Sequence, residues 1–419
     1  MPRNIPLFIA FRLLFNARFY YPIFAVLQLD YGLTMAQFAI LNAVWAASIV
    51  LLEVPSGALA DKLGRKPMVV IASVLMILEM GLIAFVPLGN ASIVFWVWVL
   101  NRILSGAAEA SASGADEALA YDSLPEGQQE KQWPKVLARL MTFSSFAFVI
   151  AMLLGGALYD AEFLNRILGT DLAKGTVIRF PVYLTLLSAL ITLPVALMMK
   201  EPETQSEEAE EELGATFWGS IWKTGHWILG TPLVFALILA ALVHDTLVRL
   251  FLTMNSEYYR LIDLPESSFG VIGAGFAALG MIVPKIAQRM VEGRKMATNY
   301  LWVSLLTVVG LFLVAQAWQY YGVIVVIFFS AGFGLLNFFS SHYLNAQVSS
   351  RRRATVLSFK GLALNIGFGV TSVLYAVLLS GLNDDFKASL AWLAPSFLVM
   401  LVPLLIYYRL KVIPVEKEA

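Results

Sequence analysis

The sequence predicts an all-α membrane protein with twelve transmembrane helices, arranged as two pseudo-symmetric six-helix bundles. The first observation is composition: 59% of the 419 residues are hydrophobic and only 14% are charged, whereas soluble domains are about 45–50% apolar and about 25% charged. The second is a series of apolar runs of membrane-spanning length, and the third is one long acidic interruption near the middle. This composition excludes a soluble enzyme, a disordered chain and a nucleic-acid binder that relies on a basic field.

Residue counts also bear on cofactors. The chain has 29 basic and 29 acidic residues, so net charge favours no partner. It has no cysteine, which excludes disulfides, thiolate nucleophiles and cysteine-ligated metals. Its three histidines, His226, His244 and His342, show no metal-ligand spacing. We therefore expect no metal and no cofactor.

Each transmembrane helix needs about 20 mostly apolar residues. Charged, Gly/Pro and Asn-rich breaks separate twelve such segments, in chain order 5–29, 36–60, 68–88, 92–118, 136–159, 178–199, 227–254, 268–289, 297–318, 322–346, 354–380 and 388–408. The only long polar break, 200–226, contains seven glutamates within twelve residues, a pattern typical of a solvated linker. It divides the chain into an N-terminal bundle (1–199), an acidic cytoplasmic linker (200–226) and a C-terminal bundle (227–419).

Lysine and arginine positions predict the orientation, because they concentrate on the cytoplasmic side of membrane proteins. With both termini in the cytoplasm, 19 of the 29 basic residues fall on the cytoplasmic side and five on the other side. The remaining five, Arg12, Arg18, Arg102, Arg249 and Lys360, lie within spans. We expect a multi-pass protein of the cell membrane with cytoplasmic termini.

Two segments of the first half recur in the second half. Leu33–Leu41 opens the second span, and the similar segment Leu264–Ile272 opens the eighth. At the far ends of these spans, P-x-x-A-x₅-G-R-K occurs at 55–66 and again, with identical spacing, at 284–295. Parallel six-span halves related by an axis along the membrane normal are one architecture of alternating-access transporters. The repeat therefore favours transport over a purely structural duplication.

The loop after the second span carries the most specific motif, Gly57-Ala-Leu-Ala-Asp61-Lys-Leu-Gly64-Arg65-Lys66-Pro67. It closely resembles the G-x-L-A-D-x-x-G-R-K signature of the major facilitator superfamily, and the resemblance extends to span count, topology and central linker. It implies that Asp61 and Arg65 form a cytoplasmic latch between the halves, with Asp61 at the N-terminus of a facing helix near residue 354. Arg65 is expected to pair with Glu117 or Asp122. The proposed latch set is Asp61, Gly64, Arg65, Lys66, Glu117, Asp122 and Arg294; alternatively, these basic residues only set topology.

Span 4 carries Asn101-Arg102-x-x-x-Gly106, which resembles the family's R-x-x-x-G motif. A charge at that depth is costly, so Arg102 should face the bundle interior and find a partner. Gly155-Gly156 in span 5 lacks the proline of the glycine-rich motif found in proton-coupled drug antiporters. This departure weakens the drug-antiporter interpretation.

Polar residues within spans predict a substrate cavity, because ionisable groups at membrane depth are functional candidates. Asp245 and Arg249 are one helical turn apart and can pair within their helix, so a structural pair and a substrate site are both open. In the facilitator family the first and seventh spans line the cavity, and Arg18 and Arg249 there would attract an anionic or polar substrate. The cavity set is Asn16, Arg18, Tyr20, Tyr21, Arg102, His244, Asp245, Arg249, Asn337 and Asn365.

Carboxylates within spans are the candidates for proton coupling, since burial favours their protonated form. Glu109 and Asp116 are seven residues apart, which places them on one face of a continuous helix. Glu109 is the first choice for coupling, with Asp116 on the same face and Asp245 second. Glu79, in the middle of span 3, has no assigned role.

Together these features predict a secondary transporter of a small polar or amphipathic solute that is driven by a transmembrane ion gradient, with protons expected. A proton-driven multidrug antiporter and an uncoupled carrier of organic anions are the alternatives. A membrane-embedded enzyme or receptor is disfavoured, because the spans carry no nucleophile–base pair or metal cluster and the chain has no phosphate loop. The expected partners are the solute and the lipid bilayer, without nucleic acid, and the protein is expected to be a monomer.

Overall fold

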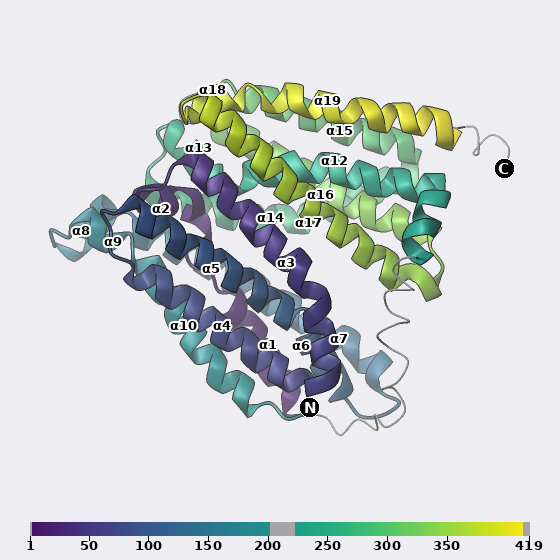
Figure 1. Cartoon of the computed structure of the whole chain (residues 1–419), viewed down its shortest axis with the longest axis horizontal. Helices are drawn as coiled ribbons and strands as arrows, with labels where there is room; N and C mark the ends of the chain where they lie inside the picture. The colour runs from purple at the N-terminus through teal and green to yellow at the C-terminus, as the bar shows by residue number, and fades with distance from the viewer. Residues whose placement is uncertain (1, 202–222, 414–419) are drawn as a thin grey trace. The chain divides into compact units, whose positions relative to one another are not determined.

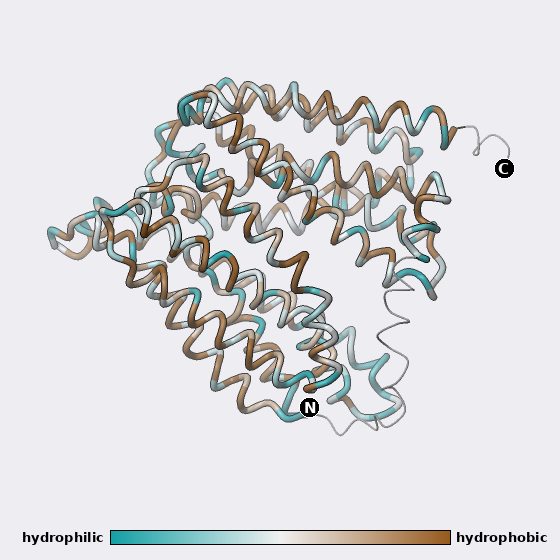
Figure 2. Tube along the Cα trace, in the orientation of Figure 1, coloured by the Kyte–Doolittle hydropathy of each residue, from teal (hydrophilic) through white to brown (hydrophobic). Residues whose placement is uncertain are grey.

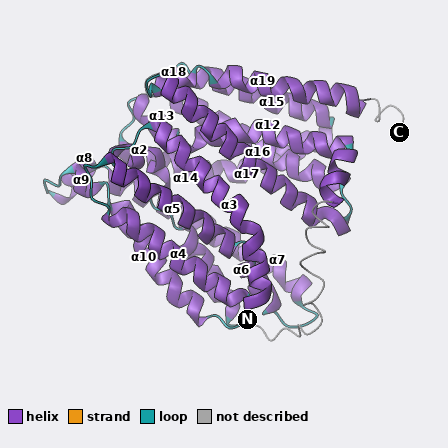
Figure 3. Ribbon diagram, viewed as in Figure 1, coloured by secondary structure: helices purple, strands orange, loops and turns teal. Residues whose placement is uncertain are grey.

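The computed structural model of the chain describes residues 2–201 and 223–413, except for the side chains at positions 54, 58, 61, 277, 278, 281, 350, 351 and 354. Every regular element in these ranges is a helix (Figure 3). The predicted linker 200–226 lies largely outside the described residues. The chain divides into two compact units, Met1–Ser206 with Leu264–Ala277, and Glu207–Asp263 with Ala278–Ala419.

Unit 1 contains the helices of the first half (Figure 1). They are α1 (Asn4–Asn16), η1 (Tyr21–Ile23), α2 (Phe24–Asp30), α3 (Met35–Leu63), α4 (Arg65–Phe85), α5 (Ala91–Ala112), α6 (Ala115–Asp122), α7 (Gln129–Tyr159), α8 (Ala161–Leu168), α9 (Lys174–Val177) and α10 (Phe180–Met198).

Unit 2 contains most of the second half. Its helices are α12 (Pro232–Thr253), α13 (Asn255–Leu261), α15 (Met296–Val314), α16 (Gly322–Gln347), α17 (Ser350–Gly381), α18 (Phe386–Leu390), α19 (Leu393–Tyr407) and η2 (Tyr408–Val412). Helix α14 (Glu266–Gly293) is divided: its first part belongs to unit 1 and its second part to unit 2. The predicted division assigned residues 264–277 to the C-terminal bundle.

Ten helices among the described residues are long and apolar enough to cross a membrane, and they correspond to predicted spans 2–7 and 9–12. Predicted span 8 is α14, whose 28 residues are also sufficient in length. Predicted span 1 is α1, η1 and α2, which together cover 4–30 with an interruption. In both units the helices are apolar along most of their length and polar at their connections (Figure 2).

The internal repeat extends to the helix boundaries. Helices α3, α4 and α5 begin at residues 35, 65 and 91, and α14, α15 and α16 begin at 266, 296 and 322, so each pair is 231 residues apart. Proline occurs inside both α3 (Pro55) and α14 (Pro284). The duplication predicted from two short segments therefore covers whole helices.

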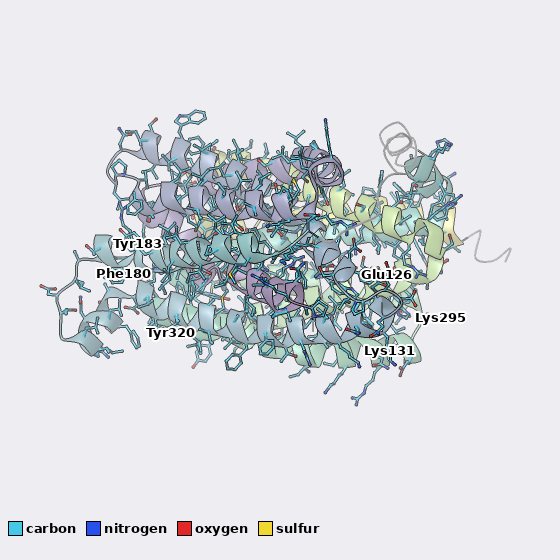
Figure 4. The ribbon with its side chains drawn as sticks, turned by 90° about the horizontal axis from the view of Figure 1, so that it is seen from below. Glu126, Lys131, Phe180, Tyr183, Lys295 and Tyr320 are labelled. Carbon is cyan, nitrogen blue, oxygen red and sulfur yellow. The ribbon has the colours of Figure 1, made fainter. Side chains whose placement is uncertain are left out.

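Each unit has its own apolar core. In unit 1, Phe11 and Phe15 of α1 are buried together with Met68, Ala72 and Met76 of α4. In unit 2, α12 packs against α16, α17 and α19 and is mostly buried. Lys131 and Phe180 lie at opposite ends of unit 1, and Lys295 and Tyr320 lie at opposite ends of unit 2 (Figure 4).

In unit 1, predicted spans 1 and 4 are not continuous helices. The helix of span 1 stops at Asn16 and resumes at Tyr21, where Pro22 lacks the N–H that an uninterrupted helix needs. Span 4 breaks at Ser113–Gly114, and Gly114 has φ +75°, a conformation that favours glycine. We refer to the interruption at 17–20 as the span-1 break.

Candidate functional site

The span-1 break places non-helical backbone inside unit 1, and α10 supplies its hydrogen-bond partners. The Phe19 N–H donates to Thr185 Oγ1 at 3.1 Å, and Ser188 Oγ donates to the Leu14 carbonyl oxygen at 2.7 Å. Backbone groups at membrane depth are costly unless satisfied in this way. Broken helices of this kind occur where they line binding sites in transporters.

A glycine allows α7 to approach the break closely. A Cβ atom at Gly155 would lie 1.8 Å from the carbonyl oxygen of Phe19 and 2.9 Å from Cγ of Pro22. Only glycine fits this contact. Gly155, one of the two glycines compared with the drug-antiporter motif, therefore has a packing role at the span-1 break.

Arg18, within the break, forms an ion pair with Glu79 of α4. The two side chains are 5% and 0% exposed. Sequence reasoning assigned no role to Glu79, because no local spacing connects it with a residue 61 positions earlier. Tertiary packing makes it the counter-ion of Arg18.

Asn101 and Arg102 of α5 continue this polar cluster. Asn101 Nδ2 donates to the backbone oxygen of Glu79 at 2.7 Å, and Asn101 Oδ1 accepts from Arg102 Nε and Nη2 at 2.9 and 2.7 Å. The Arg102 guanidinium also lies over the rings of Phe24 and Trp98, 5.2 and 5.6 Å from their centroids. The partner expected for buried Arg102 is thus an amide and two aromatic rings.

The other cavity residues near the break differ in exposure. Asn16 is exposed and donates to the Arg12 carbonyl oxygen of its own helix at 2.8 Å. Tyr20 is buried, whereas Tyr21 is 47% exposed. The structure therefore brings Asn16, Arg18, Tyr20, Tyr21 and Arg102 into one unit around one interruption.

The structure contradicts the burial expected for Glu109, whereas Asp116 is buried as expected. Glu109 is exposed on α5. The break at Ser113–Gly114 also removes the continuous helix on which Glu109 and Asp116 were expected to share a face.

Asp116 is buried and forms an ion pair with Arg12 of α1. Arg12 Nε lies 2.5 Å from Asp116 Oδ2, and Arg12 Nη2 also contacts Glu117 Oε1 at 3.1 Å. Glu117 therefore pairs with Arg12 and not with Arg65. Arg12 was missed as a site residue because its two acidic partners are more than 100 positions away.

In unit 2 the polar residues gather on α12 and α17. Arg249 Nη2 lies 2.5 Å from Asp245 Oδ2, which confirms the predicted pairing within one helix. Arg249 Nη1 donates to Asn365 Oδ1 at 3.1 Å, and its guanidinium lies 5.1 Å from the Phe368 ring centroid. Asp245 and Lys360 also interact electrostatically.

The other two predicted cavity residues of unit 2 are His244, which precedes Asp245 on α12, and Asn337. Buried His244 has Nδ1 2.8 Å from the Ala240 carbonyl oxygen and Nε2 2.8 Å from Ser304 Oγ. Asn337 is exposed on α16. In the described part of the chain, no three His, Asp or Glu residues are grouped as metal ligands would be.

The latch motif makes one contact that the sequence predicts and another that it does not. Arg65 pairs with Asp122, one of its two expected partners. Glu201 was missed: its carboxylate accepts from the backbone N–H groups of Arg65 and Lys66 at 2.9 and 2.7 Å, at the N-terminus of α4. Gly64 makes the turn at φ +92°. Arg294 lies over the Trp302 ring.

The side chain of Asp61 and that of residue 354, its expected neighbour, lie outside the described set. The proposed contact between Asp61 and a facing helix therefore stays a prediction. Glu201 belongs to the acidic run that the sequence pattern identified as solvated. Nothing in the acidic run distinguishes Glu201 from its neighbours, so the sequence does not predict its contact with a helix that begins 136 residues earlier.

A polar cluster at the other end of unit 1 fastens the beginning of α14. Asp160 Oδ2 accepts from the Ser267 N–H at 3.0 Å, and Lys174 Nζ lies 3.2 and 3.1 Å from Asp30 and Glu266 carboxylate oxygens. Burial raises the pKa of Asp160, but hydrogen bonds from Phe163 and Ser267 outweigh it, so the pKa is lowered. These residues were also missed by sequence reasoning.

The chain is similar to a known family and to several solved structures. A family model described as Major Facilitator Superfamily matches residues 7–359. No curated protein matches the sequence. Similar solved structures include the nucleoside transporter NupG (11% identity, 97% of this chain and 99% of that chain, TM-score 0.73) and a D-xylose-proton symporter (14%, 94% and 96%, TM-score 0.66). A bacterial homologue of the human lysosomal transporter Spinster is also similar (18%, 97% and 96%, TM-score 0.68).

Proposed function

Because the chain belongs to the major facilitator superfamily, we propose that it is a proton-driven secondary transporter of a small polar solute. Membership makes it a membrane transporter rather than an enzyme. We further propose that the protein works by alternating access, as a monomer in the cell membrane, with both termini in the cytoplasm.

The observation that carries the proposal is the span-1 break. It interrupts the span with four non-helical residues, one of which is Arg18. Arg18 pairs with Glu79, and hydrogen bonds link Glu79 to Asn101 and Asn101 to Arg102. Such a cluster has no use in a purely structural bundle, where apolar residues of similar volume would be as stable or more stable. Irregular backbone beside polar groups is typical of a transporter binding site.

The polar character of the site supports a polar substrate over a drug-like cation. Arg18 and Arg102 are buried in unit 1, and Gly155 of the glycine pair packs against the break. Two of the similar structures are those of a nucleoside transporter and a D-xylose-proton symporter, which agrees with a polar solute and with proton coupling.

The test is uptake by purified full-length protein in proteoliposomes. Radiolabelled uridine, D-xylose and lactate would be offered with an inward proton gradient, an inward sodium gradient or neither. We expect at least one solute to accumulate only with the proton gradient. Uptake that ignores both gradients would identify an uncoupled carrier, and proton-driven extrusion of ethidium with no polar uptake would favour the drug antiporter.

A matched pair of variants tests the site. Tyr21→Ala removes a 47% exposed tyrosine at the span-1 break, and Tyr183→Ala removes a 37% exposed tyrosine on α10 beside Phe85. We expect Tyr21→Ala to raise the KM for uptake at least about tenfold, about 1.4 kcal/mol of binding. Tyr183→Ala should leave it unchanged. Equal effects would argue against a binding site at the break.

A further inference from the structure

The ion pair of Arg18 and Glu79 has one engaged and one unengaged carboxylate oxygen. Arg18 Nη1 contacts Glu79 Oε1. Glu79 Oε2 is buried and has no hydrogen-bond partner among the described residues. A carboxylate held by one oxygen has a second oxygen on which a proton can reside.

Arg18 differs from the other paired arginines in its backbone. Arg12 lies within α1 and contacts two carboxylates, and Arg249 pairs with a carboxylate of its own helix. Arg18 stands in the non-helical span-1 break, between exposed Asn16 and exposed Tyr21. It is therefore a buried arginine that adjoins exposed polar residues on both sides and has one counter-ion to exchange.

We propose that Arg18 is an anion-binding residue that pairs alternately with Glu79 and with a transported organic anion, and that Glu79 binds a proton when the anion takes its place. This inference rests on the proposed transport function and names its substrate class. A buried guanidinium requires a counter-ion, and a buried carboxylate without one is equally costly. The exchange keeps the site neutral, so one proton and one monovalent anion enter together.

The surroundings of Glu79 suit this exchange. The charged or titratable side chains that face this region are Arg18, Tyr20 and Tyr21 on the first span, Tyr31 after α2, Arg102 and Glu109 on α5 and Arg179 before α10. Arg102 is held by Asn101 and two aromatic rings, and Arg179 by the Ala84 and Val86 carbonyl oxygens. Arg18 is thus the arginine of this group that is paired with a carboxylate.

The absence of cysteine makes a direct test available, because an introduced thiol is unique in the chain. In full-length Asn16→Cys protein in proteoliposomes, we would measure the rates of reaction with anionic MTSES and permanently cationic MTSET between pH 9 and pH 5. The ratio of the two rates cancels the thiolate fraction, since both reagents need the thiolate. It reports the local charge near Arg18.

We expect the MTSES/MTSET ratio to rise about tenfold on acidification, when protonated Glu79 no longer neutralises Arg18. Adding Glu79→Gln should give a high ratio at every pH, and adding Arg18→Gln a low, constant one. The comparison variant is Asp116→Asn, which removes a buried carboxylate of the same unit while Arg12 keeps Glu117. It should keep the pH response.

A constant ratio in the parent protein would overturn the inference, and so would a pH response that survives Glu79→Gln or disappears in Asp116→Asn. If Glu79→Gln does not fold, the pH response of the parent protein and its loss in Arg18→Gln still test the inference. Transport measurements separate the two proposals: proton-driven uptake that survives Glu79→Gln overturns only the exchange. If the charge response occurs as expected but no solute is taken up, the proposed transport function is overturned, whereas proton binding at Glu79 beside Arg18 stands.

Discussion

Arg65 forms an ion pair with Asp122, and the two residues begin α4 and end α6. The Glu201 carboxylate accepts from the backbone N–H groups of Arg65 and Lys66 at the same helix start. The family signature therefore lies in a network that connects the α3–α4 turn, α6 and the segment after α10. In each of these contacts the two partners are far apart in the sequence.

The first prediction concerns this network. Arg65→Ala, Asp122→Asn and Asp61→Asn should each reduce the maximal transport rate about tenfold or more and leave KM nearly unchanged, because the network affects conformational change rather than substrate binding. Lys62→Ala, which removes an exposed charge from the same turn, is the control. Distances between spin labels on the two halves would report the conformational cycle. A variant with a large rise in KM and an unchanged cycle would contradict a role of this network in conformational change.

The second prediction compares the candidate carboxylates for proton coupling. Sequence reasoning favours Glu109, but Glu109 is exposed and Glu79 is buried against Arg18. We therefore expect Glu79→Gln to abolish accumulation of substrate while preserving downhill exchange, and Glu109→Gln to retain accumulation. The measurement is radiolabelled uptake with and without a proton gradient. If Glu109→Gln alone abolishes accumulation, the coupling role returns to Glu109.

The third prediction concerns close packing at the span-1 break. Gly155→Ala should destabilise the protein by about 1–3 kcal/mol, because the added Cβ would overlap the Phe19 carbonyl oxygen. Gly81→Ala in α4 adds the same atom where nothing lies within 4 Å, so it should be neutral or slightly stabilising. Thermal unfolding in detergent compares the two. Equal melting temperatures would show that the break tolerates a looser approach of α7.

The fourth prediction is a pH dependence at Asp160. Its pKa is lowered in the folded state, so the ionised carboxylate contributes stability above its unfolded pKa of about 3.9. That contribution is lost as the pH falls through the lower folded value. Asp160→Asn should therefore melt below wild type at pH 7, and the difference should shrink below about pH 4. A difference that grows in acid would mean that the carboxylate is not held by Ser267 and Phe163.

The fifth prediction separates structure from function at Asp245 and Arg249. Asp245→Ala leaves the Arg249 guanidinium without its carboxylate and should cost about 3–5 kcal/mol of stability. Asp245→Ala combined with Arg249→Leu removes both charges and should recover most of it. Melting temperature and uptake would be measured together. Recovery of both would make the pair structural, whereas recovery of stability alone would place it in the transport cycle.

Local patterns in the sequence alone determined the spans, the duplication and one ion pair. Apolar runs predicted the spans, because a helix must hide its backbone from lipid wherever it crosses. A motif repeated at constant spacing predicted a duplication that the helix starts at 35 and 266, 65 and 296 bear out. The pair of Asp245 and Arg249 was predictable because one helical turn separates them.

Tertiary structure decided the rest, because the partners of buried charges are chosen by packing and not by spacing. Glu79 pairs with Arg18, Asp116 pairs with Arg12, and Glu201 accepts hydrogen bonds at the start of α4. The partners are separated by 61 to 136 residues. Exposure likewise depends on which helices cover a face, and for that reason Glu109 is exposed and Glu79 is buried. A single chain's sequence lists the ionisable groups within its spans; only the folded helices determine which of them neutralise one another.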